Sequence, residues 1–371
     1  MKKLFKIIGR IVDKLPKKYI AFESIPDYSD NSWAVYEYMK ASSLFKKYRF
    51  VWIKDKRDSH RKGVRGVYFK SKFARFFLKR SVAIIYSNKI ISKSSEHQIS
   101  VFLCHGSKAK KTRGVYEAPK DLDYILVQAD IFKDAIKYEY NLSDKTEMVT
   151  LGYPRNDDLL SDNKIDFRSI IGENYDKLIV WYPTFRQHKN ADINVSNITL
   201  PIIHDEKSAE LLNECAKEND VLILLKPHFA QNTEFIQKRQ FSNLRIINDE
   251  FLMKRKIRSY QLLAASDALL TDYSSVYYDY LLKDAPIGLV WEDYDEYKKK
   301  QGFAMNPDMV YAGGEKIYSV EDFCAFIRRI ANNEDILSVE RNAIKELTNV
   351  YQDSNSAERV SNFIFEKISK L

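Results

Sequence analysis

The sequence predicts an α/β protein of two domains, each built on a parallel β-sheet. With 371 residues, the chain is long enough for two domains of ordinary size and too long for one compact core. Short apolar runs alternate with segments of helical periodicity, which is typical of βαβ units. A polar stretch at residues 161–177 separates two such series. No repeat of about 20 to 50 residues is present, which excludes solenoids and propellers.

The first series begins with an apolar run at residues 19–24, which we expect to form a strand. In order, the next predicted elements are a helix at 32–45, runs at 50–53 and 67–69, a helix at 73–79, runs at 83–87, from 101 and at 124–128, a helix at 131–140 and a run from 148. The runs have the length of buried strands, so the order is strand and helix in alternation.

The second series predicts strands at 178–181, 221–225, 244–247, 268–270 and 287–291, followed by a helical tail beyond residue 320. Residues 187–201 lack periodicity and predict a loop. We place the domain boundary near 160–176. The expected organisation is a basic helix at 1–17, a first domain at 18–165, and a second domain at 170–371 that includes the tail.

Cysteine usage and hydropathy indicate a reducing compartment. Cys104, Cys215 and Cys324 are odd in number and far apart, which fits neither a disulfide framework nor a metal site. Charges interrupt the apolar residues of the N-terminus, so no secretory signal is predicted. No stretch of membrane-spanning length is free of charge. We therefore expect the protein to remain in the cytoplasm and to hold no metal.

The positive charge is concentrated at the front of the chain. Residues 1–80 hold 22 Lys and Arg against 7 Asp and Glu, although the whole chain carries a formal charge of only +9. Residues 1–17 place apolar side chains on one helical face with lysines around them, which favours a helix lying on an anionic membrane surface. The alternatives are a helix docked on its own domain and a nucleic-acid contact, for which no RNA-binding or zinc-finger signature is present.

The most informative stretch is residues 268–291, which reads as strand, turn, helix and strand. Its turn, Thr271-Asp272-Tyr273-Ser274-Ser275, places serines at the start of the helix. Serines there can cap the helix, or they can help to bind a phosphate at the positive end of the helix dipole. On this stretch alone both interpretations stay open.

Four further motifs follow predicted strands, where open parallel sheets bind their ligands. His105 precedes a glycine and several lysines, and a histidine can accept a proton at neutral pH. Lys226 and His228 flank a proline that stiffens their turn. Arg186 ends the WYPTFR motif and can bind a phosphate through two nitrogens. The motif at 152–157 contains Arg155. A plain surface turn is the alternative at each position.

Together these motifs supply histidines, arginines, lysines and serines, which suits transfer of a phosphate-linked group. The sequence has no Walker motif, no GxGxxG, no HExxH, no paired-cysteine metal site and no GxSxG nucleophile elbow.

The ordered motifs resemble the CDP-glycerol glycerophosphotransferase family of teichoic-acid synthesis, which includes glycerol- and ribitol-phosphate transferases and polymerases. The resemblance rests on FES and YSDNSWAVYEYM at 22–39, HGSKAKK at 105–111, LGYPRND at 151–157, WYPTFR at 181–186, KPH at 226–228, LLTDYSSVYYDYLLKDAPI at 269–287 and GF at 302–303.

This resemblance implies two Rossmann-like domains of the glycosyltransferase-B fold, with the donor held by the C-terminal domain. It implies transfer of a polyol phosphate from a CDP-polyol to a hydroxyl of a lipid-linked acceptor, a polyprenyl diphosphate or glycolipid, at the cytoplasmic membrane face, with release of CMP. No cofactor and no nucleic acid are implied. The implied catalytic residues are His105, as the base that deprotonates the acceptor hydroxyl, and His228. Asp279, one turn into the helix after Ser275, is a further catalytic candidate that could orient a histidine or hold donor hydroxyls, and a solvated helix carboxylate is the alternative. The implied donor-binding residues are Thr184, Arg186, Lys226, Thr271, Ser274, Ser275 and Gln301. The implied acceptor-side residues are Ser29, Asn31, Lys108, Arg155, Asn156 and Asp157.

The chain departs from the family pattern at three places. Ser107-Lys108 stands where Thr-Pro is usual, Gln301 where an arginine is common, and Ala312-Gly313-Gly314 where Pro-Gly-Pro is common. The last two lie near where the polyol would be bound, so glycerol, ribitol or another polyol, in a wall polymer or a capsule, stays open. The alternatives are a sugar-nucleotide-dependent glycosyltransferase of the same fold and a non-catalytic protein that binds anionic surfaces.

Overall fold

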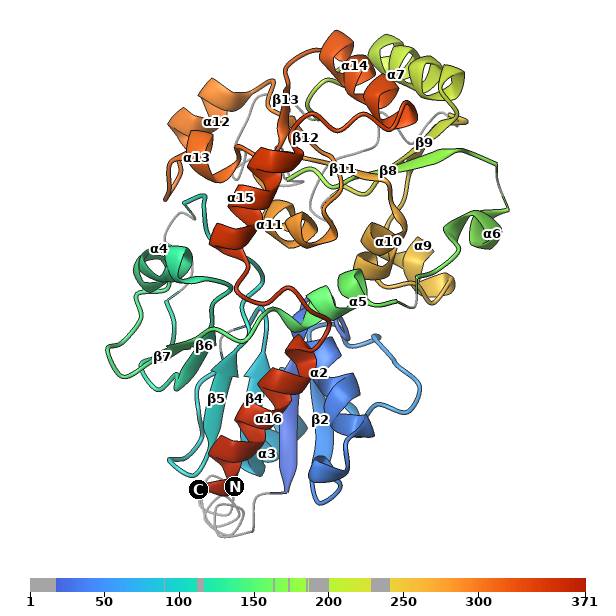
Figure 1. The fold of residues 1–371 in the computed structure, drawn as a ribbon. Helices are drawn as coiled ribbons and strands as arrows, with labels where there is room; N and C mark the ends of the chain where they lie inside the picture. The colour runs from blue at the N-terminus through green and yellow to red at the C-terminus, as the bar shows by residue number, and fades with distance from the viewer. Residues whose placement is uncertain are drawn as a thin grey trace. The chain divides into compact units, whose positions relative to one another are not determined.

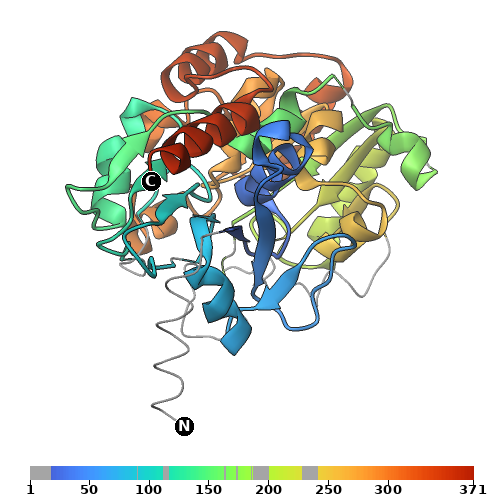
Figure 2. The same ribbon diagram turned by 90° about the horizontal axis from the view of Figure 1, so that it is seen from below.

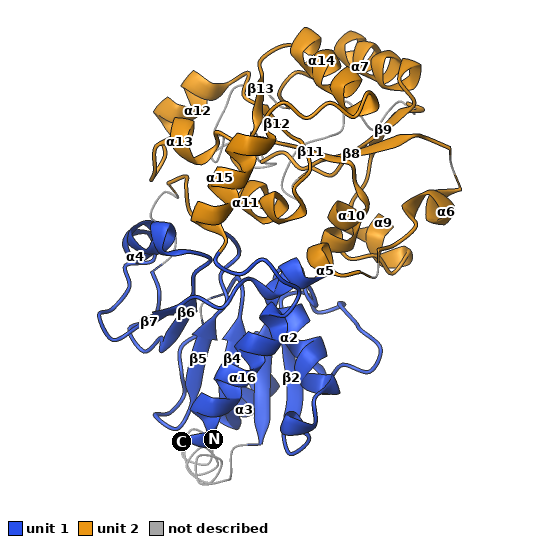
Figure 3. Ribbon diagram, in the orientation of Figure 1, with its two compact units in different colours: residues 1–107, 114–157, 350–371 blue, residues 108–113, 158–349 orange. Residues whose placement is uncertain are grey.

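The structure is a computed structural model. It describes residues 18–89, 91–111, 117–162, 164–172, 174–184, 186, 200–227 and 241–371. The basic helix predicted at 1–17 and residues 187–199 of the predicted loop lie outside the described residues. The chain divides into two compact units, coloured separately in Figure 3. Unit 1 comprises residues 1–107, 114–157 and 350–371, and unit 2 comprises residues 108–113 and 158–349.

The described strands of unit 1 form one parallel sheet of seven strands (Figure 1). In spatial order they are β3 (Gly66–Tyr68), β2 (Arg49–Lys54), β1 (Tyr19–Glu23), β4 (Ser81–Tyr86), β5 (Ile99–Phe102), β6 (Tyr124–Leu126) and β7 (Glu147–Val149). The helices of this unit are α2 (Asp30–Ala41), α3 (Lys72–Lys79), α4 (Lys133–Glu139) and α16 (Ser356–Ser369), with 3-10 turns η1 (Ser43–Phe45), η2 (Asp130–Phe132) and η3 (Pro154–Asn156).

Alternating side chains along β1 explain why this sheet carries helices on both faces. Tyr19 packs edge-on against Phe77 of α3, with ring centroids 5.0 Å apart. Phe22, on the other face, packs against Tyr36 of α2 at 5.3 Å. Successive residues of a strand point to opposite faces, so a run that is apolar at every position needs cover on both. Helix α16 lies beside α2, as Figures 1 and 2 both show.

Unit 2 contains a second parallel sheet, of six described strands. In spatial order they are β10 (Leu244–Ile246), β9 (Val221–Leu225), β8 (Lys177–Trp181), β11 (Ala268–Thr271), β12 (Ile287–Val290) and β13 (Glu315–Ile317). Its described helices are α6 (Phe167–Ile171), α7 (Glu206–Glu218), α9 (Asp249–Lys254), α10 (Ser259–Ala265), α11 (Val276–Tyr280), η5 (Leu281–Lys283), α12 (Tyr294–Lys300), α13 (Pro307–Val310), α14 (Val320–Ala331) and α15 (Ser338–Thr348). Helix α5 (Asp157–Leu160) begins at the last residue of unit 1.

The core of unit 2 is large and contains bulky side chains. Trp181 at the end of β8 is wholly buried and packs against Phe323 of α14 with ring centroids 5.1 Å apart. Helix α7 packs beside α14 on the same core. Burial of apolar area at about 25 cal/mol per Å² makes such contacts the main stabilising contribution to the unit.

The strand order of each sheet reverses at one point. In unit 1 the chain runs outward from β1 to β3 and then returns to β4 on the other side of β1, so the switch point lies between β1 and β4. In unit 2 it lies between β8 and β11 by the same reasoning. Ligands of open α/β sheets bind beyond the carboxyl ends of the strands at such points.

Each predicted apolar run corresponds to a strand, and the two compact units differ from the expected domain ranges in three ways. Residues 108–113, expected in the first domain, belong to unit 2. The division falls at residues 157 and 158, just before the predicted boundary range. The helical tail was expected in the second domain, but residues 350–371 belong to unit 1, because α16 packs on α2. Among the described residues, no helix is long and apolar enough to span a membrane.

Candidate active site

The predicted base of unit 1 follows β5, which pairs with β4 beside the switch point. The Nδ1 atom of His105 lies 2.5 Å from Oδ2 of Asp30, the first residue of α2. The His105 side chain is 61% exposed, whereas that of Asp30 is only 6% exposed. An accessible imidazole is therefore supported by a buried carboxylate.

Two neighbouring residues fix this pair. The side-chain amide of Asn31 donates to the carbonyls of the two residues before His105, at 3.1 and 3.0 Å, and its oxygen accepts the backbone N–H of Arg155 at 3.1 Å. Arg155 Nη1 donates to Oδ1 of Asp30 at 2.8 Å and to the carbonyl of His105 at 2.9 Å. Burial alone would raise the pKa of the Asp30 carboxyl, but Arg155 and His105 outweigh it and hold the pKa well below its usual range.

The other predicted acceptor-side residues have different surroundings. Ser29 Oγ donates to the carbonyl of Pro26 at 2.5 Å, and Asn156 is buried. The carboxylate of Asp157 accepts the backbone N–H groups of the first two residues of α16, at 2.9 and 2.8 Å, and burial raises its pKa to about 6. Asp157 thus caps the C-terminal helix α16. Lys108 belongs to unit 2.

At the switch point of unit 2, the ends of β8 and β11 are joined by a buried ionic network. Arg186 is wholly buried, and its Nη1 lies 2.6 Å from Oδ2 of Asp272. Its Nε and Nη2 donate to the two oxygens of Asp293 at 2.7 and 3.0 Å. The backbone N–H and hydroxyl of Thr184 donate to Asp272 as well, at 2.9 and 3.0 Å. Thr271 Oγ1 donates to the carbonyl of Tyr182 at 2.7 Å.

This network changes the interpretation of Arg186. Burial would lower the pKa of its guanidinium, but the two aspartates raise it above its ordinary value, so Arg186 stays charged. Its three nitrogens already bind carboxylates, and a bidentate phosphate contact would require these ion pairs to open. Arg186 holds Asp272 and Asp293, and through Asp272 it supports Thr184. Direct phosphate binding by Arg186 stays a prediction.

The remaining donor-side residues surround this network. Ser274 and Ser275 are partly exposed beyond β11, and Ser275 makes no side-chain capping hydrogen bond to α11. The plain helix cap that the sequence left open is thus absent at Ser275. Lys226 follows β9, the neighbour of β8, and its Nζ lies 2.8 Å from Asp249. His228 lies outside the described residues.

Two predicted residues have roles that sequence could not indicate. Asp279 is wholly buried in α11 and accepts the hydroxyl of Tyr260 at 2.5 Å. Gln301, after α12, donates its side-chain amide to the carbonyl of Lys111. Backbone bonds between residues 109–111 and 302–305 extend this contact within unit 2. The structure thus brings Thr184, Arg186 and Thr271 together, and separately His105, Asn31 and Arg155.

Three acidic residues at the two switch points were not predicted as functional. Asp30 lies in the quoted YSDNSW motif, but its partners His105 and Arg155 are 75 and 125 residues away in sequence. Asp272 lies in TDYSS, but its partners Thr184 and Arg186 are 88 and 86 residues away. Asp293 lies in no predicted motif. A buried arginine needs carboxylate partners, but the burial of Arg186 appears only in the structure, so no sequence signal indicated these acidic residues.

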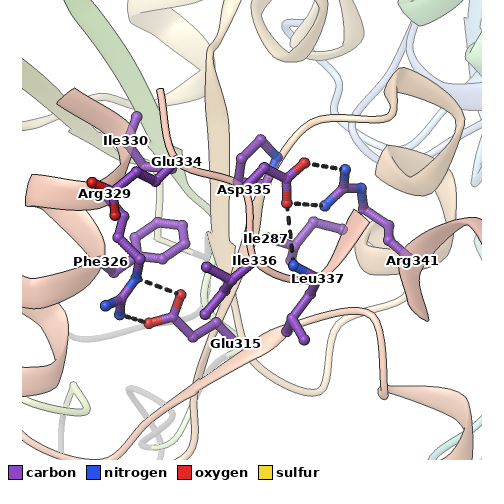
Figure 4. Close-up of a pocket in the computed structure, with 11 residues that line it drawn as sticks. Ile287, Glu315, Phe326, Arg329, Ile330, Glu334, Asp335, Ile336, Leu337 and Arg341 are labelled. Carbon is purple, nitrogen blue, oxygen red and sulfur yellow. Dashed lines mark hydrogen bonds and ion pairs between the residues drawn. The ribbon is translucent and has the colours of Figure 1, made fainter. Parts of the chain in front are cut away.

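A pocket of unit 2 lies at the opposite edge of the sheet (Figure 4). Ile287 and Glu315, which begin β12 and β13, line it together with residues of α14 and α15. Its arginines are already paired: Arg329 with Glu315, and Arg341 with Asp335. Ligands of parallel sheets bind at the carboxyl ends of strands, so this pocket is not the donor site.

Two units with parallel sheets and polar residues gathered at both switch points define the glycosyltransferase-B class of fold. A solved variant of the wall teichoic acid polymerase TagF is similar, with a TM-score of 0.75 and 20% identity, covering 97% of this chain and 91% of that chain. The S. aureus MnaA–UDP co-structure has a TM-score of 0.51 and 12% identity, covering 96% and 98%. The predicted fold class is confirmed.

The chain belongs to the CDP-glycerol:poly(glycerophosphate) glycerophosphotransferase family, which matches residues 5–366. The teichoic acid glycerol-phosphate primase of Bacillus subtilis (strain 168) is 23% identical over 290 residues, covering 78% of this chain and 69% of the relative. The teichoic acid poly(glycerol phosphate) polymerase of the same organism is 24% identical over 404 residues, covering 98% of this chain and 51% of the relative. The chain thus spans about half of that polymerase. The predicted family and class of enzyme are confirmed.

Proposed function

We propose that this enzyme transfers glycerol phosphate or ribitol phosphate from a CDP-polyol to a hydroxyl of a lipid-linked acceptor in teichoic-acid or capsule synthesis, with release of CMP. The observation that carries the proposal is the exposed His105 at a sheet edge, with Nδ1 held by Asp30, in a chain whose family match covers nearly its whole length. The relatives include a teichoic acid ribitol-phosphate primase of Bacillus spizizenii (strain ATCC 23059 / NRRL B-14472 / W23), 23% identical over 255 residues, so both polyols stay within the proposal.

The reaction is an in-line displacement at phosphorus. The acceptor oxygen forms a bond to the phosphorus that carries the polyol, the bond to the bridging oxygen breaks, and CMP leaves with the electron pair. His105 takes the acceptor proton. Because charge spreads over the phosphate oxygens, catalysis depends chiefly on positioned cations and donors. Lys226, Ser274 and Ser275 supply these on the donor side, together with His228.

The acceptor end of the proposal rests on unit 1. Asn31 and Arg155 do not need to touch the acceptor to matter, since they hold the His105 loop by its carbonyl groups. The acceptor is a lipid-linked polyprenyl diphosphate or a glycolipid, and only its attacking hydroxyl must reach His105.

We place the enzyme at the cytoplasmic face of the membrane as a peripheral protein that binds an anionic surface. The described residues support this through a basic and aromatic segment at 56–80, which holds ten Lys and Arg against one Asp. Phe73 in α3 is 71% exposed, and Lys72 and Arg75 beside it are also exposed. A basic helix with an exposed aromatic residue can insert into the headgroup layer.

Liposome co-sedimentation tests this placement. Deleting residues 2–17, or replacing Lys72 and Arg75 by glutamate, is expected to weaken binding to anionic vesicles while turnover of a soluble acceptor analogue is retained. Equal binding to anionic and zwitterionic vesicles by the unmodified protein would refute the anionic-surface assignment.

The activity is tested by measuring CMP release from CDP-glycerol and from CDP-ribitol with a lipid-linked acceptor. The variants His105→Ala and His228→Ala are each expected to lose on the order of 10² to 10⁴ in rate. His97→Ala, an exposed histidine of unit 1, is the matched control and is expected to keep full activity. Full activity of both site variants would end the assignment. A thermal shift with UDP- or CMP-sugars but not with CDP-polyols would favour the glycosyltransferase alternative.

A further inference from the structure

We propose that Asp30 is the positioning residue for His105: its carboxylate orients the imidazole so that Nδ1 carries a proton and Nε2 is the atom that receives the proton of the acceptor. This inference rests on the proposed function, because it assigns a role within the same reaction. The contact that carries it is the 2.5 Å distance between His105 Nδ1 and Asp30 Oδ2.

The two side chains of this contact differ in exposure, which shows on which side the ring is supported. The Asp30 side chain is 6% exposed and the His105 side chain 61%, so the carboxylate supports the ring from its buried side. A ring nitrogen that donates to a carboxylate fixes the tautomer, which leaves the other nitrogen as the acceptor of protons. Nε2 is the nitrogen that the described residues leave available to an acceptor hydroxyl.

The backbone on both sides of the contact is strained. Asp30 has a φ of +60° and Cys104, next to His105, a φ of +56°. This left-handed region is unfavourable for residues other than glycine, and such conformations persist at sites where the surroundings fix them. Asn31 supplies that fixation, because its N–H donates to Oδ1 of Asp30 at 2.8 Å while its side chain donates to the carbonyls before His105.

Arg155 keeps the carboxylate charged. The Arg155 side chain is 7% exposed, and its Nη1 lies 2.8 Å from Oδ1 of Asp30. The two oxygens of the Asp30 carboxylate therefore contact the arginine and the histidine separately. In the described part of unit 1, Asp30 from α2 and Arg155 from η3 are the charged residues that contact His105. Asp30 therefore stays ionised and does not take the proton itself.

The chemical step needs no reactant besides the donor and the acceptor. As the acceptor oxygen bonds to phosphorus and CMP leaves, the hydroxyl proton moves to Nε2. The imidazolium that forms carries a positive charge beside the Asp30 carboxylate, which stabilises it. The proton then passes to solvent from the exposed ring.

The variants Asp30→Asn and Asp30→Glu test the inference in the full chain with CDP-polyol and lipid-linked acceptor. An asparagine amide that donates to Nδ1 selects the wrong tautomer, so kcat is expected to fall by about 10²-fold or more with little change in KM for the donor. Glutamate is expected to restore part of kcat.

A double-mutant comparison separates positioning from plain stability. In the His105→Ala background, Asp30→Asn is expected to change the remaining rate by less than about two-fold, because the ring that it orients is gone. An equal loss in both backgrounds, or full activity of Asp30→Asn, would overturn the inference while leaving the proposed function intact. Loss of CMP release in the unmodified protein would instead overturn the proposed function.

A spectroscopic measurement on the unmodified protein covers the case in which Asp30→Asn does not fold. The ¹⁵N shifts of the His105 ring, assigned by their absence in His105→Ala, are expected to show the Nδ1–H tautomer at a pH where the ring is neutral. A predominant Nε2–H tautomer would contradict the positioning role directly.

Discussion

At the switch point of unit 1 a buried carboxylate supports an exposed imidazole, whereas at that of unit 2 two buried carboxylates enclose an arginine. His105 is 61% exposed and Arg186 is wholly buried. Both clusters lie at the carboxyl ends of neighbouring parallel strands, and both join an aspartate to a basic residue.

The difference in exposure between His105 and Arg186 indicates which cluster can take part in the reaction and which one stabilises the fold. An accessible imidazole can exchange protons with a substrate, and its cluster needs only one inward contact to be oriented. A guanidinium with every nitrogen occupied cannot exchange partners without cost, so it fixes the loops around it. A polar residue at a sheet edge can therefore be reactive if its partners leave one of its polar atoms accessible to a substrate. If all of its polar atoms are bound by partners, it is structural.

The largest expected effect comes from opening the buried cluster. Arg186→Met leaves Asp272 and Asp293 without their cation in a buried site, so the free energy of unfolding of unit 2 is expected to fall by about 3 to 5 kcal/mol. Denaturant unfolding monitored by tryptophan fluorescence measures the loss. Arg328→Met, an exposed arginine on α14, is the control and is expected to change stability by about 0.5 kcal/mol or less. A loss below about 1 kcal/mol for Arg186→Met would show that the cluster is not structural.

A second buried carboxylate of unit 1, that of Glu23, can be compared with Asp30, because burial outweighs the groups that favour its charged form. Glu23 ends β1 at the switch point, is 1% exposed, and its Oε1 has no hydrogen-bond partner. Burial raises its pKa to about 7, although the N–H groups of Asn88 and Lys89 oppose the shift. The folded state thus favours the protonated form. The contribution of neutral Glu23 to the free energy of unfolding is fully present below about pH 4.5. It is lost as the pH rises to about 7, because the buried carboxyl must then ionise.

Glu23→Gln is therefore expected to be more stable than the unmodified protein at pH 8, by about 1 to 3 kcal/mol, and to lose this advantage at pH 4.5. Thermal unfolding at the two pH values measures the difference. Glu96→Gln, an exposed glutamate of the same unit, is expected to show no such pH dependence. Equal stability of Glu23→Gln and the unmodified protein at both pH values would mean that Glu23 is not buried as a neutral group.

Much of the fold could be predicted from the sequence because its strands are continuous apolar runs. Every predicted run corresponds to a strand of one of the two sheets. Strand β13 (Glu315–Ile317) was missed because its three residues, Glu-Lys-Ile, have no apolar periodicity. The return of α16 to unit 1 was missed because it depends on packing against α2 and on the cap from Asp157, which are contacts between distant parts of the chain.

The candidate site could be predicted as a set of positions but not as a set of interactions. Strand ends located His105, Thr184 and Thr271, since parallel sheets place such residues at one edge. The partners decide the role of each residue, and they are not encoded nearby. Phosphate binding by Arg186 was predicted from its residue type, whereas its contacts with two aspartates appear only in the folded structure.

The smallest expected effect concerns Gln301, which the sequence placed near the polyol of the donor. Its amide donates to the carbonyl of Lys111, and one neutral hydrogen bond contributes about 0.5 to 1.5 kcal/mol. Gln301→Ala is therefore expected to lower kcat/KM by less than about ten-fold, and by the same factor for CDP-glycerol and CDP-ribitol. Lys299→Ala, an exposed lysine on α12, is the control for local helix stability. A loss for one donor only would place Gln301 at the polyol, because a residue that merely holds residues 109–111 in place has no means of distinguishing two polyols.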